Sequence, residues 1–193
     1  NTTEDDALTF EVLGGAGHWI CYFCALGYDL VDSYRSVPDS ITVIGPESIL
    51  KSMTTVRTKL LNLSAVNSNI DQDVDLELPI LSNQLKYSHQ TVSLSAEVAK
   101  FTEGSVNVPV TIINVPKAVN INFFPKEIPV IFYATLKAYN SIDAGDFSVE
   151  CDFNSLNIDN NYLNPVLVNQ PINIKTAKLK VTQLEYVITP KND

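Results

Sequence analysis

Short runs of apolar and β-branched residues, separated by polar turn residues, make up most of this chain. Within these runs Val, Ile, Thr, Tyr and Phe often alternate with polar residues, and Asn, Asp, Ser, Gly and Pro lie between the runs. A period of two is typical of strands that bury one face. The segments expected to be strands are WICYFCA, ITVI, VRTKLLNL, VDLELPIL, QTVSLSAEV, VNVPVTII, EIPVIFYATL, FSVECDF, LVNQPINI and LKVTQLEYVI. The pattern therefore predicts an all-β protein.

The segment ITVIGPESILKSM, residues 41–53, changes from the period of a strand to that of a helix. Pro46 suits the first turn of a helix, and Glu47 suits its positive end. Three apolar residues then fall on one helical face, namely Ile49, Leu50 and Met53. The sequence therefore predicts one short helix of about two turns over residues 46–55, directly behind a strand.

Two parts of the chain resemble each other at long range. VPDSITVI (37–44) is similar to FPKEIPVI (124–131), with Pro38 matching Pro125 and Val43 matching Val130. The alternation in TVSLSAEV (91–98) has a counterpart in AKLKVTQLEYV (177–187). These similarities predict two tandem β units of roughly 85–90 residues each.

We place the first unit at residues 26–100 and the second at 101–190. Residues 1–25 then form an N-terminal segment, with a charged tail and an uncertain first strand. The boundary is expected to be a polar hinge at residues 101–104. The second unit reads YATLKAY where the first reads GPESILKSM, which weakens the case for a second helix.

Composition narrows the classes of function. The chain has 193 residues, 45% of them apolar, with 13 basic and 22 acidic side chains and a net charge of −9. This charge repels phosphate backbones, so we expect no nucleic-acid partner. No apolar run of about 18 residues or more is present, which excludes a membrane-spanning helix within this sequence. Because the chain starts at Asn1 and not at Met, we expect a targeting or anchoring segment to have been removed.

Cysteine, histidine and glycine motifs give little support for catalysis. Cys21 and Cys24 have the spacing of redox and zinc motifs, but no second ligand pair accompanies them, so we expect buried thiols. His89 is expected at the surface, and no G-x-S-x-G nucleophile motif is present. GGAGH at 14–18 lacks the spacing of a phosphate loop, and the neighbouring Trp19 and Phe23 are expected in the core. We therefore predict no catalytic residue, no cofactor and no small-molecule substrate.

An acidic row is the one candidate for metal binding. Asp71, Asp73, Asp75 and Glu77 fall on one face of a predicted strand, about 6.5–7 Å apart along it. That spacing would suit a calcium site completed by loop oxygens, or the paired carboxylates of an inverting glycosidase. Since Val74, Leu76 and Leu78 occupy the opposite face, the interpretation that we prefer is a solvated face that discourages edge pairing.

The stretch 27–64, GYDLVDSYRSVPDSITVIGPESILKSMTTVRTKLLNLS, resembles the YbbR domain. YbbR repeats have a glycine-led strand, a P-x-x-V-x-V-x-G-P-x-x-x-L segment, a short helix and a V-x-T-x-x-x-D/N-L segment. The residues that match are Gly27, Pro38, Ile41, Val43, Gly45, Pro46, Leu50, Val56, Thr58 and Leu63. Asn62 stands where Asp is usual. With a degenerate second copy, the resemblance extends over about residues 25–189.

The resemblance implies a bacterial, non-enzymatic regulator. YbbR proteins are typically held outside the cytoplasmic membrane by one N-terminal helix. The family members that are best understood regulate the membrane diadenylate cyclase, which makes cyclic di-AMP, through protein contact. We therefore expect an extracytoplasmic domain with a membrane diadenylate cyclase as its partner. The alternatives are a structural or adhesive module of the cell envelope and a carbohydrate-active or calcium-binding enzyme built on the acidic row.

Overall fold

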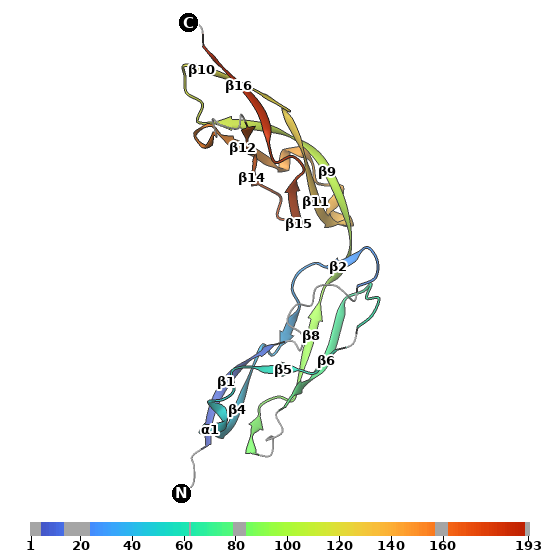
Figure 1. Ribbon diagram of the computed structural model, residues 1–193. Coiled ribbons are helices and arrows are strands. Elements are labelled where there is room, and N and C mark those ends of the chain that lie inside the picture. Colours follow the sequence, from blue (N-terminus) through green and yellow to red (C-terminus); the bar gives the residue numbers. More distant parts are fainter. Residues whose placement is uncertain (1–4, 14–23, 62, 79–83, 157–161, 192–193) are drawn as a thin grey trace. The chain divides into compact units, whose positions relative to one another are not determined.

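The computed structural model describes residues 5–13, 24–61, 63–78, 84–156 and 162–191. Strands dominate these residues, and the α-helices among them, α1 (Glu47–Leu50) and α2 (Leu136–Tyr139), have four residues each (Figure 1). The prediction of an all-β protein is confirmed. The chain divides into two compact units, residues 1–100 and residues 101–193.

Unit 1 is built on a seven-stranded sheet with the order β3-β8-β6-β5-β1-β4-β7. Its strands are β1 (Asp5–Leu13), β3 (Arg35–Val37), β4 (Ser40–Pro46), β5 (Val56–Thr58), β6 (Ile70–Glu77), β7 (Lys86–Tyr87) and β8 (Thr91–Ala96). A further strand, β2 (Tyr28–Leu30), pairs with residues 98–100 at the start of β9 (Val98–Ile113).

Unit 2 contains two sheets. One has the order β14-β12-β9-β11-β15, with β11 (Glu127–Thr135), β12 (Ser148–Asp152), β14 (Val166–Asn169) and β15 (Ile174–Leu179). The other has the order β10-β16-β13, with β10 (Val119–Phe124), β13 (Tyr162–Leu163) and β16 (Leu184–Pro190). Two 3₁₀ turns, η2 (Ala144–Asp146) and η3 (Phe153–Ser155), flank β12.

The two units repeat one plan of strand pairing. In unit 1, β1 is antiparallel to β4 and parallel to β5. In unit 2, β9 is antiparallel to β11 and parallel to β12 in the same way. The outer pairs also correspond, because β4–β7 matches β11–β15 and β3–β8 matches β10–β16.

Strand β6 has two counterparts in unit 2. The N-terminal part of β6 pairs with β8 and its C-terminal end pairs with β5. In unit 2 these two pairings are shared between β13, which pairs with β16, and β14, which pairs with β12. Asn164 and Pro165 separate β13 from β14. Since Pro cannot donate a ladder hydrogen bond, it accounts for the interruption of this strand.

The residues matched between the two units occupy equivalent places. Val43 on β4 and Val130 on β11 are both completely buried. Pro38 and Pro125, which precede these two strands, both follow cis peptide bonds. Val43 belongs to a core with Ile41, Leu50, Val56, Leu76, Leu85 and Val92, and Val130 to a separate core that includes Val108, Ile128, Phe132, Val149 and Leu184. That unit 2 is itself a YbbR-like repeat stays a prediction.

The division between residues 100 and 101 lies where the boundary was expected, but two other expectations about the units were wrong. Unit 1 begins ahead of residue 26, because β1 lies between β4 and β5 in the sheet. The expected polar hinge at residues 101–104 lies inside β9, where Phe101 pairs with Thr135 and Gly104 with Phe132. Thr102 and Glu103 look like linker residues because they are polar, yet they lie on the half-buried and exposed positions of a paired strand.

The helix predictions also need correction. α1 ends at Leu50, about one turn earlier than predicted, and the chain turns at Lys51 and Ser52 before β5 starts at Val56. The β-branched Thr54 and Thr55 favour this early end. In unit 2 the YATLKAY segment does contain a helical turn, α2. It starts because the Thr135 Oγ1 atom accepts a hydrogen bond from the Ala138 amide at 3.2 Å.

We predict that Val43→Asp unfolds unit 1, whereas Ile44→Asp leaves it folded. An unpaired carboxylate at a fully buried position costs several kcal/mol, which is comparable to the whole stability of a small domain. Ile44 is the adjacent residue on the same strand and is 37% exposed, so it is a matched control. Thermal unfolding followed by circular dichroism measures both variants. An unchanged melting curve for Val43→Asp would contradict the assignment of Val43 to the core.

Candidate functional site

The motif residues of unit 1 surround the crossover from β4 through α1 to β5. Pro46 ends β4 and caps α1, and Leu50, which is 1% exposed, anchors the helical turn in the core. Thr58 at the end of β5 is 2% exposed although it is polar. These positions hold the backbone connection in place, so the structure gives them a structural role.

Gly45 permits a close approach between two segments. A Cβ atom at this position would lie 2.4 Å from Leu85 Cδ2 and 2.9 Å from the backbone oxygen of Gln84. Both distances are shorter than a van der Waals contact. Leu85 is itself a buried core residue. The motif glycine is therefore required by packing against the segment before β7.

Leu63, the last motif residue, lines a small apolar hollow. Its neighbours there are Leu30, Tyr34, Leu61, Ile70, Leu94 and Ala96, and the space measures about 40 Å³. Because this volume is far below the several hundred Å³ of typical ligand pockets, the hollow is a packing defect and not a ligand site.

The acidic row lies on β6 as predicted. Asp71, Asp73, Asp75 and Glu77 are exposed, while Val74 and Leu76 are buried on the opposite face. Lys59 Nζ forms an ion pair with Asp75 Oδ2 at 3.0 Å. Among the residues that the structure describes, no group of three or more acidic, histidine or cysteine side chains could hold a metal ion. The geometry favours a solvated face over a calcium site.

The cysteines differ from the expectation. Cys24 is disulfide-bonded, so the prediction of a buried thiol was wrong for this residue. Cys21 lies outside the described residues. Cys151 on β12 is a free thiol with no exposed surface, and burial raises its pKa to about 11. A thiol that stays protonated and inaccessible is a poor nucleophile.

His89 lies at the surface, as predicted. Its Nδ1 atom lies 3.0 Å from the Ser88 hydroxyl, which accepts a hydrogen bond from the Thr42 amide. This arrangement connects a turn to β4. His18, Trp19, Phe23 and the GGAGH segment lie outside the described residues. No helix within the described parts of the chain is long and apolar enough to cross a membrane.

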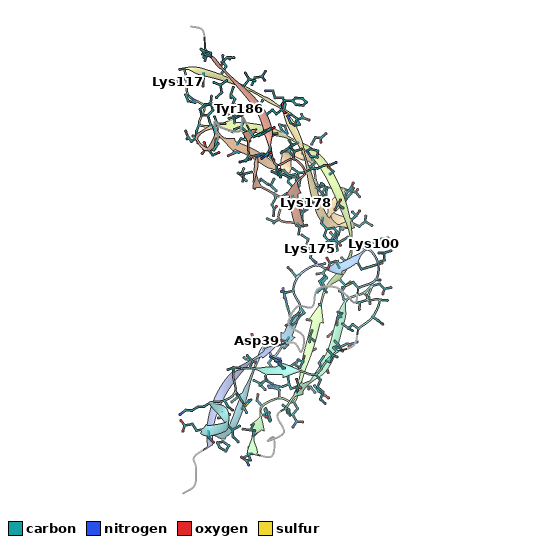
Figure 2. All side chains as sticks on the ribbon, in the orientation of Figure 1. Asp39, Lys100, Lys117, Lys175, Lys178 and Tyr186 are labelled. Carbon is teal, nitrogen blue, oxygen red and sulfur yellow. The ribbon has the colours of Figure 1, made fainter. Side chains whose placement is uncertain are left out.

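One surface feature of unit 2 was not predicted from the sequence. An open hollow of about 610 Å³ lies over β10, β16 and β13, and its lining includes the exposed aromatic residues Phe124 and Tyr162. The polar residues Asn122, Lys126 and Glu185 also line it. Figure 2 shows Tyr186, another lining residue, toward the same end of the unit as Lys117 and away from Lys175 and Lys178. In the sequence, the adjacent aromatic residues Phe123 and Phe124 are the feature that could have indicated this hollow.

These observations define a class of protein that has two β units of the same topology. In this class the motif residues have a structural role. Residues 25–94 match the family described as YbbR-like protein. The first unit is therefore similar to the YbbR-like proteins over these residues. The prediction made from the motif residues of the stretch 27–64 is confirmed.

Two individual proteins are similar to this chain. The CdaA regulatory protein CdaR of Bacillus subtilis is 26% identical over 162 residues, which cover 79% of this chain and 33% of that protein. The chain thus spans about a third of the length of this curated relative. A crystal structure of a YbbR-like protein from Streptococcus pneumoniae is 14% identical, with a TM-score of 0.37 over 99% of this chain and 98% of that one.

We predict that Gly45→Ala destabilises unit 1 by about 1–3 kcal/mol, because the new methyl group overpacks the contact with Leu85. Urea unfolding of the wild type, both single variants and the Gly45→Ala/Leu85→Ala double variant forms a thermodynamic cycle. The cost of Gly45→Ala should fall in the Leu85→Ala background. Equal costs in the two backgrounds would show that the Leu85 contact is not the reason for the glycine.

We also predict that calcium does not stabilise the protein. A ligand that binds the folded state raises its melting temperature, and no described group offers a calcium cage. Melting curves recorded with millimolar calcium and with a chelator should coincide. A rise with calcium that disappears in Asp73→Asn would restore the acidic row as a metal site.

Proposed function

We propose that this chain is a non-enzymatic regulatory module that controls a membrane diadenylate cyclase by protein contact. The observation that carries the proposal is the similarity of 79% of the chain to a CdaA regulatory protein. The match of residues 25–94 to the YbbR-like family supports it. The burial of most motif residues supports it as well, since a framework motif leaves the solvent-exposed faces available for a partner; the buried ones are Ile41, Val43, Gly45, Leu50, Val56 and Thr58.

The proposed location is outside the cytoplasmic membrane, with attachment through an N-terminal transmembrane helix. The disulfide at Cys24 supports this location, because disulfides persist in oxidising compartments and are rare in the cytosol. Attachment next to the bilayer would hold the units close to the membrane-embedded part of the cyclase. Contact would then occur at a high effective concentration.

The charge of the chain favours control of the cyclase through protein contact over direct binding of its product, cyclic di-AMP. Cyclic di-AMP carries two phosphates, and its binding calls for converging Lys or Arg side chains or a nest of backbone N–H groups. The net charge of −9 opposes such binding. A dinucleotide made inside the cell would also not reach a domain outside the membrane.

We predict that the cyclase co-purifies with the chain when the chain is anchored in the membrane. The test expresses the chain behind an N-terminal transmembrane helix together with the full-length cyclase, then measures recovery of the cyclase and production of cyclic di-AMP. We expect recovery of the cyclase and a several-fold change in product. Calorimetry of the unanchored chain with cyclic di-AMP should give no heat of binding.

Two variants separate specific contact from nonspecific recovery. Val43→Asp should lose the cyclase because unit 1 unfolds, and Ile44→Asp should retain it. Micromolar binding of cyclic di-AMP would overturn the proposal. If the anchored, folded chain recovers no cyclase and leaves production unchanged, the regulatory proposal fails, and a structural or adhesive role in the envelope replaces it.

A further inference from the structure

Three side chains form a row across the small sheet of unit 2. Phe124 on β10 pairs with Glu185 on β16, and Glu185 pairs with Tyr162 on β13. Paired residues of adjacent strands share one face of a sheet. All three are exposed, Phe124 to 74% and Tyr162 to 39%. Two aromatic side chains therefore flank a carboxylate on a solvent-facing surface.

The fold does not require aromatic residues at these positions. By the correspondence of strands, the equivalent row in unit 1 is Val37, Ser93 and Asp73, where Val37 and Asp73 both pair with Ser93. Val37, like Phe124, comes directly before a proline in cis and is exposed. Unit 1 thus forms the same three-stranded arrangement without an aromatic ring in this row. The aromatic row belongs to the surface of unit 2 and not to its framework.

The row lies in a hollow that has hydrogen-bonding groups around the rings. Its volume of about 610 Å³ is within the range of ligand sites. Asn122 and Val187, which pair with each other, extend the same face by one further row. Lys126 Nζ donates to Asn122 Oδ1 at 2.9 Å and lies 3.8 Å from the centroid of the Phe123 ring. The hollow therefore offers apolar ring faces next to donors and acceptors.

The charges in this hollow oppose an ionic ligand. Its lining includes one cation, Lys126, and one anion, Glu185. A phosphate would meet the Glu185 carboxylate, and the Lys126 ammonium is already engaged by Asn122 and Phe123. A cation would meet Lys126. The equivalent face of unit 1 has a hollow lined by Arg35, Asp32, Asp71 and Glu97, where acidic groups outnumber basic ones.

We propose that the face formed by Phe124, Glu185 and Tyr162 binds a neutral oligosaccharide. Sugar rings have apolar C–H faces that pack on aromatic rings, and hydroxyl rims that donate to carboxylates and accept from side-chain amides. The Cα atoms of Phe124 and Tyr162 are two strand spacings apart, about 10 Å. A ligand that contacts both rings must therefore be longer than one sugar unit. This site is independent of the proposed contact with the cyclase.

The test titrates the whole chain with two neutral β-1,4-linked tetrasaccharides, one of glucose and one of N-acetylglucosamine, and with their monosaccharides. Calorimetry should show binding of at least one tetrasaccharide and at least tenfold weaker binding of its monosaccharide. Phe124→Ala and Tyr162→Ala should each weaken the tetrasaccharide about tenfold or more. The matched control is Val37→Ala at the equivalent position of unit 1, which should leave binding unchanged.

A triple variant keeps the test independent of folding. Phe124→Val, Glu185→Ser and Tyr162→Asp together install the row that unit 1 already carries, so the variant should keep its melting temperature within a few degrees and lose binding. Absence of binding by both tetrasaccharides would overturn the proposal. Binding that survives the triple variant would do the same. A decaproline peptide that binds through Phe124 while the sugars do not would assign the hollow to a peptide instead.

Discussion

The pairing of two central strands, each with a completely buried valine, is the constraint on which the rest of both units depends. β4 pairs with β1 and β11 pairs with β9, and Val43 and Val130 lie at the middle of these pairs. Because side chains alternate between faces, a shift of one residue would expose either valine and bury its less buried neighbours instead. The helical turns, the parallel strands β5 and β12, and the outer strands are all positioned by this register.

In both units a glycine beside the buried valine lies against a bulky buried side chain, but the glycine is on a different strand in each unit. In unit 1, Gly45 on β4 leaves space that Leu85 fills. The position 87 residues later is Phe132, and there the glycine is on the partner strand. A Cβ atom on Gly104, which pairs with Phe132, would lie 2.4 Å from the Phe132 ring. Phe132 packs against Tyr139 of α2 and Phe147. Each unit thus places a glycine against a bulky buried side chain, but the glycine lies on β4 in unit 1 and on β9 in unit 2.

The sequence indicates the framework better than the surface, for physical reasons. Alternation, cis-proline positions and the Gly-Pro break reflect local backbone requirements, so the strand-rich fold and the match of Val43 to Val130 could be inferred from them. Residues 101–104 were misread as a hinge because the polar residues Thr102 and Glu103 resemble a linker, although they lie in a long paired strand. The row of Phe124, Glu185 and Tyr162 was missed because strands far apart in the sequence bring it together through register. The disulfide at Cys24 was missed for another reason, because the C-x-x-C spacing of Cys21 and Cys24 was interpreted as two buried thiols.

A framework shared by two units places their functional differences on the solvent-facing side. The buried positions must satisfy the same packing in each unit, and they accept mainly apolar residues of suitable size. The exposed positions of the β3-β8-β6 face and of the β10-β16-β13 face carry no such requirement, and here the two units have diverged. One carries Val37, Ser93 and Asp73, and the other carries Phe124, Glu185 and Tyr162. Exposure to water does not stabilise an aromatic side chain. The presence of two such side chains on only one of two equivalent faces therefore points to a contact made by that unit. A tandem chain of this kind can therefore keep one unit for one partner and the other for a second, without a change in either core.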